Sequence, residues 1–131
     1  ALSRIYLNAR RNNQISSCVV LQSVSAQDGY RSGEDAFLLI ESEAEPEVAV
    51  YTAADGEALS IQCVHSASRI PVGFYMKSEG HVELSFQTQG NDWDGWCFVD
   101  TQTGKRYSLT DNITLDDVAS GSGRFYLEKE D

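Results

Sequence analysis

The segment Asn91–Trp96 combines the residue types that proteins use to bind sugars. Its sequence is Asn-Asp-Trp-Asp-Gly-Trp. Aromatic rings stack on the apolar faces of sugar rings, while carboxylates and amides bind the hydroxyl groups. One interpretation is a ligand-binding loop in which an exposed Trp93 is supported by Asp94 and Trp96. The other is that both indoles cap the core, and Trp96 favours this because it begins an apolar run.

The loop Asp28–Asp35 places Asp28, Glu34 and Asp35 near glycines, as a calcium-binding loop does. Calcium needs roughly six to eight oxygen ligands at fixed offsets in the chain. The EF-hand spacing is absent, and Arg31 puts a positive charge in the middle of the loop. We therefore predict a structural turn, in which Asp35 accepts hydrogen bonds from neighbouring backbone amides, and no metal site.

No pattern in the chain points to catalysis. The histidines, His65 and His81, have no Cys or Asp partner at a spacing typical of a catalytic triad or metal site, so we predict that both are solvated. The Gly-x-Ser-x-Gly and phosphate-loop patterns are absent. A carboxylate pair for glycoside hydrolysis cannot be chosen from 20 acidic residues without geometry. We predict no catalytic residue, no cofactor and no enzymatic activity.

The charge balance argues against nucleic acid as a partner. The chain carries 20 acidic and 10 basic residues, a formal net charge of −10. Binding to phosphate backbones depends on clustered Lys and Arg, and here the basic residues are scattered apart from Arg4, Arg10 and Arg11. The same balance disfavours an anionic membrane surface. No apolar run approaches the roughly 18 residues that a transmembrane helix needs, so we predict no membrane insertion.

The three cysteines, Cys18, Cys63 and Cys97, each lie within an apolar run. No two have a CxxC spacing, so a zinc site has no support. Thiols buried as small apolar side chains are the expected state. One disulfide with a third thiol left over is the alternative, and the sequence leaves it open.

Apolar residues alternate with polar ones in the second half of the chain, which is the period of a β-strand. Residues 70–76 and 81–87 both alternate in this way, and the turn-like link Lys77–Gly80 predicts that they form a β-hairpin. A second predicted hairpin joins Trp96–Val99 to Arg106–Leu109 through a turn closed by Gly104. Two further short strands are expected at Ile113–Leu115 and Arg124–Leu127, with Ser120–Gly123 as a polar connection.

The first half of the chain predicts strands of the same kind. Arg4–Leu7 and Cys18–Leu21 are expected strands, separated by a polar turn at Arg10–Gln14. The continuous apolar run Ala36–Ile40 is expected to be a strand that is either covered on both faces or bent at a sheet corner. The acidic stretch Glu41–Glu47 is an expected exposed loop. Val48–Tyr51 and Ala58–Ile61 flank Ala54-Asp-Gly56, which predicts another hairpin.

These elements predict an all-β fold. About ten short strands punctuated by turns indicate a β-sandwich or barrel, and two packed antiparallel sheets are the expected arrangement. A jelly-roll and an immunoglobulin-like sandwich both fit, because the sequence does not give the strand order. No repeat and no linker divides the chain, so residues 1–131 are expected to be a single sandwich domain. Because Ala1 leads almost directly into the first strand, we expect the domain to be cut from a longer chain.

The order of several short motifs resembles a known family. They are Arg4-Ile-Tyr-Leu-Asn8, the loop Asp28–Ala36, Ile70-Pro-Val-Gly-Phe74, the turn Asp100-Thr-Gln-Thr-Gly104 and Gly123-Arg-Phe-Tyr-Leu127. In this order they resemble the β-sandwich modules near the C-terminus of secreted and cell-surface, adhesin-like, type IX-secreted proteins of Bacteroidota. Arg31, Tyr6 and Cys97 depart from the family pattern. The resemblance implies extracellular or outer-surface display and no catalytic machinery.

The sequence therefore predicts a non-catalytic interaction or structural module of the adhesion type, from a bacterial secreted or surface protein. Its partner would be another protein or a surface glycan. The alternative is a carbohydrate-binding module that uses Trp93, Asp94 and Trp96. The ligand, the oligomeric state and the parent architecture are left open by the sequence.

Overall fold

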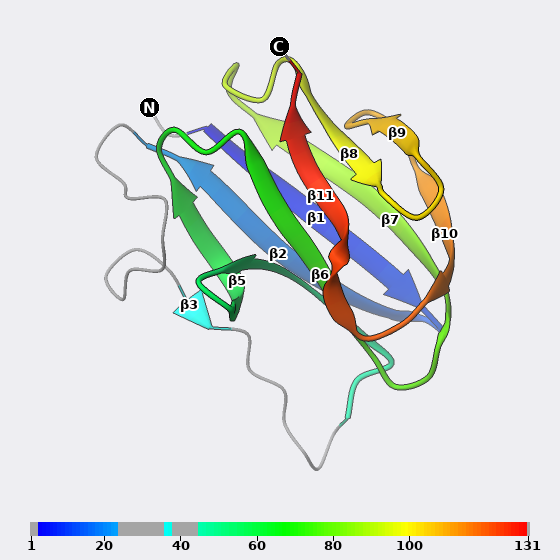
Figure 1. Ribbon diagram of the computed structural model, residues 1–131. Coiled ribbons are helices and arrows are strands. Elements are labelled where there is room, and N and C mark those ends of the chain that lie inside the picture. The colour runs from blue at the N-terminus through cyan, green and yellow to red at the C-terminus, as the bar shows by residue number, and fades with distance from the viewer. Residues whose placement is uncertain (1–2, 24–35, 38–44, 131) are drawn as a thin grey trace.

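The computed structural model confirms the all-β class. It describes residues 3–23, 36–37 and 45–130, and in these ranges it contains eleven strands and no helix (Figure 1). The strands are β1 (Ser3–Arg11), β2 (Gln14–Gln22), β3 (Ala36–Phe37), β4 (Val48–Ala54), β5 (Glu57–Val64), β6 (Arg69–Met76), β7 (Gly80–Gln89), β8 (Trp96–Asp100), β9 (Lys105–Ser108), β10 (Ile113–Val118) and β11 (Gly121–Lys129).

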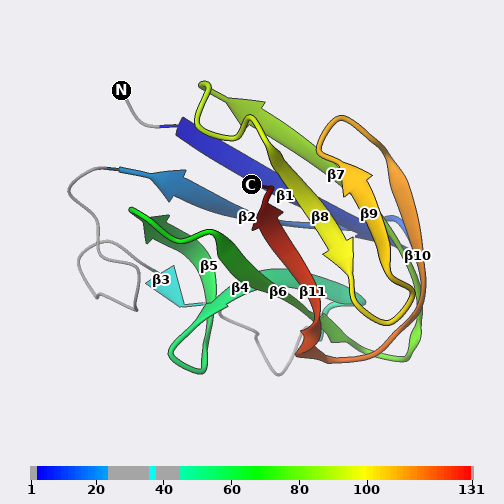
Figure 2. The same ribbon diagram turned by 45° about the horizontal axis from the view of Figure 1, so that its top comes forward.

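The strands form one continuous sheet that curls into a nearly closed barrel. The order of hydrogen-bonded neighbours is β10-β7-β1-β2-β5-β4-β6-β11-β8-β9, with β3 paired to β5. β6, β8 and β11 lie over β1, β2 and β7, as both views show (Figures 1 and 2). Because one path links the strands, the predicted division into two sheets is not confirmed. The expectation of purely antiparallel pairing is wrong, since β2 and β5 are parallel.

The core fills the inside of the barrel, and the strand period places it there. Along β1, the buried residues Ile5, Leu7 and Ala9 alternate with more exposed ones, as every second side chain of a strand points to the same face. Opposite strands supply Phe74, Phe98 and other fully buried side chains to the same cluster. Each buried Leu, Ile or Phe side chain stabilises the fold by about 1.5–3 kcal/mol. The core therefore draws on both halves of the chain.

Two tight turns set the register of the first two hairpins. Asn12 and Asn13 join β1 to β2 with φ of 49° and 67°, and Asp55 and Gly56 join β4 to β5 with φ of 52° and 78°. Positive φ at both central residues defines the type I′ turn, whose twist matches that of paired strands. The β4–β5 hairpin is confirmed. The turn predicted at Arg10–Gln14 is longer than the observed one, because both strands continue up to the two asparagines.

The predicted hairpin between residues 70–76 and 81–87 is wrong. Both strands exist, as β6 and β7, but they do not pair with each other. β6 pairs with β4 and β11, whereas β7 pairs with β1 and β10. The link Lys77–Glu79 therefore crosses from one side of the barrel to the other. The β8–β9 hairpin is confirmed, with Gly104 at φ 77° and its N–H bonded to the Asp100 carbonyl at 2.8 Å.

Three predictions fall wholly or partly outside the described residues. The loop Asp28–Asp35 lies outside them, and so do residues 38–40 of the predicted strand Ala36–Ile40 and residues 41–44 of the acidic stretch. Of that strand the structure describes β3, which pairs with β5 at Leu59 and Ile61.

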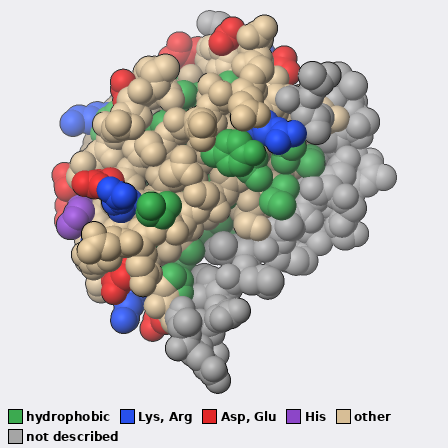
Figure 3. Space-filling model, turned by 180° about the vertical axis from the view of Figure 1, so that it is seen from behind, with side chains coloured by type: hydrophobic (Ala, Val, Ile, Leu, Met, Phe, Trp, Pro, Cys, Tyr) green, Lys and Arg blue, Asp and Glu red, His purple; other side chains and the backbone are tan. Residues whose placement is uncertain are grey.

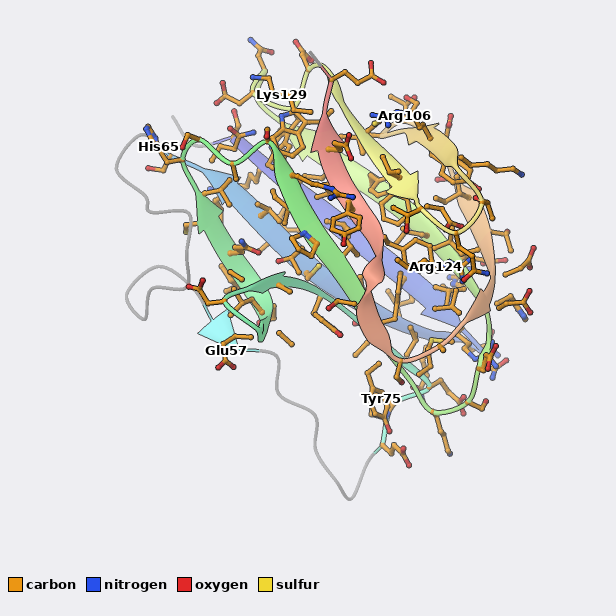
Figure 4. The ribbon with its side chains drawn as sticks, in the orientation of Figure 1. Glu57, His65, Tyr75, Arg106, Arg124 and Lys129 are labelled. Atoms are coloured by element: carbon orange, nitrogen blue, oxygen red, sulfur yellow. The ribbon has the colours of Figure 1, made fainter. Side chains whose placement is uncertain are left out.

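Arg124 closes the seam of the barrel. This residue of β11 donates two hydrogen bonds of 3.0 Å to the carboxylate of Asp100 at the end of β8. It also donates to the backbone carbonyls of Asp116 and Asp117 in β10, at 3.1 and 2.9 Å. Figure 4 shows Arg124 between β11 and β10. One guanidinium thus joins β10, at one end of the strand path, to β8 and β11 near the other end.

Irregular pairing on two strands prepares this contact. The ladder between β10 and β7 shifts between Leu115 and Val118, and Asp117 within that shift has φ 55°. The ladder between β11 and β6 shifts between Gly121 and Phe125, on either side of Arg124. Such shifts release backbone groups from ladder pairing and redirect side chains. They leave the two β10 carbonyls available to Arg124.

The buried Asp100 is held in its charged form. Its side chain is 3 % exposed and that of Arg124 is 19 % exposed. Burial by itself raises the pKa of the Asp100 carboxyl, but hydrogen bonds from Arg124 and from the Gln102 N–H outweigh it and hold the pKa below its ordinary value. The pair therefore resembles a buried ion pair, whose disruption leaves an uncompensated charge.

We expect Asp100→Asn to lower the free energy of unfolding by about 3 kcal/mol at neutral pH, because Arg124 then lacks a counter-charge. Since the native pKa of Asp100 lies below the unfolded one, this stabilisation is fully present above the ordinary aspartate pKa. It is lost as the pH falls through the lowered native value. Urea unfolding of wild type and variant across this range measures both effects.

Arg106→Ala is the matched control, because the Arg106 side chain is exposed and its ion pairs to Glu128 and Glu130 are long, at 3.5 and 3.6 Å. Exposed pairs contribute little to stability, so this variant should unfold close to wild type. Equal losses for the two variants would contradict the role assigned to Asp100.

Candidate functional site

The structure buries both tryptophans of the predicted sugar-binding loop. Trp93 is 4 % exposed and Trp96 is 6 % exposed, and their rings meet edge to face with centroids 5.0 Å apart. The expectation that Trp93 presents an exposed ring is therefore wrong, and the alternative that both indoles cap the core is confirmed. Asp94 is exposed. A ligand-binding role for these three residues stays a prediction, with no exposed indole face to support it.

Contacts from the first two strands hold this loop in place. The Ser3 hydroxyl accepts a hydrogen bond from the Asp92 N–H at 3.4 Å, and the Gln22 side chain donates to the Asp92 carbonyl at 2.9 Å. Both indole Nε1 atoms are buried without a hydrogen-bond partner. The loop between β7 and β8 thus covers one end of the barrel. There the apolar packing of the two indole rings outweighs the cost of their two unpaired N–H groups.

We expect Trp93→Ala to lower the free energy of unfolding by about 3–5 kcal/mol, the range for removing a large aromatic ring from a core. Asp94→Ala is the control, because its side chain is exposed, and it should unfold like wild type. Thermal or urea unfolding of both variants provides the measurement. A stable Trp93→Ala protein would show instead that the ring is dispensable for the fold.

Neither histidines nor cysteines assemble a reactive centre. His65 and His81 are both exposed, as expected. Among the described residues, no group of three or more His, Cys, Asp or Glu side chains is placed to hold a metal ion. No disulfide joins Cys18, Cys63 and Cys97, so the prediction of thiols is confirmed, although Cys63 is half-buried rather than buried. Burial raises the pKa of the Cys18 thiol to about 12.

The raised pKa predicts that Cys18 resists alkylation. At pH 8 a thiol with a pKa near 12 is ionised to about one part in ten thousand, and the thiolate is the reactive form. We expect iodoacetamide to modify Cys18 at pH 8 only after the protein is unfolded in urea. Peptide mass spectrometry measures the extent of modification. Modification of Cys18 at equal rates in native and unfolded protein would contradict the burial of this thiol.

Two exposed isoleucines mark a surface that the core does not explain. Ile15 on β2 is 63 % exposed and Ile61 on β5 is 38 % exposed, and no other large hydrophobic residue in the described ranges is so exposed. Ile61 is the register partner of Val19 in the parallel β2–β5 ladder, and Val19 lies four residues beyond Ile15 on β2. Because side chains alternate along a strand, all three point to the same outer side of the sheet.

Neighbouring strands extend this surface, which we call the outer β2 face. Its side chains point outward from β1, β2, β5 and β7, and it includes the half-buried Tyr6 and Leu21. The face is hollowed beside Ile15, where a depression of about 420 Å³ runs across β1 and β7 to Thr114 of β10. Figure 3 looks onto this side of the molecule and shows hydrophobic side chains gathered there with basic ones beside them.

Charges of both signs accompany the apolar side chains. Arg4 and Arg10 occupy outward positions of β1, and Glu83 of β7 is the register partner of Arg10. Neither arginine forms an ion pair with another described residue. The face therefore offers exposed apolar surface and cationic groups that have no ion-pair partner among the described residues, on a protein whose net charge is −10. Exposed apolar surface with charged groups around it is common at macromolecular interfaces.

Sequence reasoning missed this face. Ile15 follows the segment that was expected to be a turn, and its exposure depends on which way the extended β2 strand turns its odd-numbered residues. A weak signal for a longer strand was present. Every second residue from Ile15 to Leu21 falls on one face, so the strand period extends before Cys18. No helix in the described residues is long and apolar enough to cross a membrane.

Comparison of the chain with protein-family models, with curated proteins and with solved structures finds no match.

Proposed function

We propose that this domain is a non-catalytic structural module that assembles by pairing its outer β2 face with that of a second copy. The observation that carries the proposal is that Ile15 and Ile61 are exposed on the same side of the sheet. Isolated surface hydrophobics are common in soluble proteins, but two exposed isoleucines on one side of a sheet, one of them next to a depression, favour an interface. Covering Ile15 and Ile61 removes apolar surface from water and favours association.

The charges of the face support a second copy as the partner. A two-fold interface must be complementary to itself, so any charge on it needs an opposite charge on the same patch. The outer β2 face has Arg4 and Arg10 together with Glu83. Over the rest of their surfaces, two copies of a chain with net charge −10 repel each other. The arginines of β1 lower the local negative charge where the copies would meet.

The remaining parts of the proposal rest on the sequence. The chain shows no catalytic pattern, and its motif order resembles adhesin-like modules of secreted and surface proteins of Bacteroidota. A module that pairs with itself suits display outside the cell, where it would join copies of a larger surface protein. Hydrolysis of a glycan or an ester that is lost on substitution of one carboxylate or serine would overturn the non-catalytic part.

The assembly is tested by sedimentation velocity and light scattering over a wide range of protein concentration at physiological salt. We expect a concentration-dependent dimer of the wild-type chain. Ile15→Asp should raise the dissociation constant at least about tenfold, since it replaces apolar contact by buried charge on both copies. The substitution should be tolerated by the fold because Ile15 is 63 % exposed.

Gln102→Glu is the matched control, because it adds the same charge in the exposed β8–β9 turn. This variant should dimerise like wild type. A wild-type chain that stays monomeric at millimolar concentration, or a dimer that Ile15→Asp leaves intact, would overturn the proposed assembly.

A further inference from the structure

A second cleft opens where β4 changes partner. β4 pairs with β6 from Val48 to Thr52 and with β5 from Thr52 to Ala54. β5 and β6 therefore separate beyond Thr52. Among the described strands, only β11 pairs with residues Arg69–Pro71 of β6. The gap is a cleft of about 400 Å³, which we call the fork cleft, lined among others by Ala53, Gly56, Gln62, Arg69, Pro71 and Tyr126.

A buried and unpaired acceptor lies at this cleft. The Gln62 side chain is 3 % exposed, and its Oε1 has no hydrogen-bond partner. Native proteins pair nearly all buried polar atoms, so an unpaired acceptor beside a cleft is available to a donor on a ligand. The terminal torsion of glutamine is broad and two-fold, so rotation of the amide can bring Oε1 to the cleft.

The other lining residues indicate which kind of ligand could supply a hydrogen-bond donor to Gln62. The Arg69 guanidinium stacks on the Tyr126 ring at 3.7 Å from its centroid, and it also pairs with Glu128 at 3.5 Å. The Glu128 carboxylate balances the charge of Arg69, and Asp55, which also lines the cleft, disfavours an anionic ligand. Ala53, Ile70 and Pro71 add an apolar floor. Together these groups suit a neutral ring that carries hydroxyls at its edge and C–H groups on its face.

We propose that the fork cleft binds a neutral saccharide, with Gln62 Oε1 accepting a hydrogen bond from a ring hydroxyl and Arg69 donating to a second sugar oxygen. The C–H face of the ring packs on the apolar floor. The site is separate from the Asn91–Trp96 loop and from the outer β2 face, so saccharide binding is independent of assembly.

The test is a titration of ¹⁵N-labelled protein, followed by two-dimensional NMR, with glucose, galactose, N-acetylglucosamine and their β-linked disaccharides up to tens of millimolar. We expect saturable shifts of the Gln62 side-chain amide and of backbone amides in Ala53–Gly56 and Ser122–Tyr126 for at least one sugar. Gln62→Leu should weaken that binding at least tenfold without destabilising the fold, because it removes an unpaired polar atom.

Two further variants keep the result interpretable. Arg69→Gln should also weaken binding, and its side chain is 52 % exposed, so folding is not at risk. Gln102→Leu in the exposed β8–β9 turn is the control and should bind like wild type. The proposal is overturned if no probe gives saturable shifts in the cleft, if the shifts arise only around Trp93, or if Gln62→Leu binds as tightly as wild type. Sedimentation of Gln62→Leu, expected to match wild type, separates this outcome from a failure of assembly.

Discussion

The contact between Arg124 and Asp100 is the constraint on which the barrel depends. A single sheet of this order ends at β10 and β9, and these two strands do not pair with each other. Arg124 joins β10 to the opposite end of the sheet, because it binds two carbonyls of β10 and the carboxylate at the end of β8, the neighbour of β9, at the same time. The Arg124 carbonyl is also bound by Thr101, from both its N–H and its hydroxyl, at 2.9 and 2.7 Å. Polar contacts thus close the seam that the backbone ladder leaves open.

Closure of the seam determines what the two outer surfaces can do. Once β10 and β7 are held against the rest of the barrel, the outward residues of β1 and β2 form a hollowed face that none of the described strands covers. On the other side, β4 bridges two strands that curve apart, and the divergence leaves the fork cleft with its unpaired Gln62 oxygen. Both candidate sites are therefore consequences of how the sheet bends, and neither lies on the loop that the sequence singled out.

The Asn91–Trp96 loop shows why composition alone could not decide between exposed and buried tryptophans. Two Trp residues among Asp and Asn fit a sugar-binding loop and a core cap equally well in sequence. Each of these structures uses large aromatic rings flanked by polar residues. Which one occurs depends on whether the loop folds back over the barrel. Ser3 and Gln22 hold it there by hydrogen bonds to Asp92, which is 89 and 70 positions away from them in the chain, respectively. Contacts of that range leave no local pattern in the chain.

The sequence by itself determined the all-β class, the places of most strands, the glycine-closed β8–β9 turn and the Asp55–Gly56 hairpin. These features depend on side-chain alternation and on φ at single residues, which act within a few positions of the chain. Only the tertiary structure decided which strands pair, as the separation of β6 from β7 shows. It likewise decided that Trp93 is buried and Ile15 exposed. The physical reason is that an alternating strand can pair with any neighbour that offers a matching apolar face, so its partner is chosen by the packing of the whole barrel.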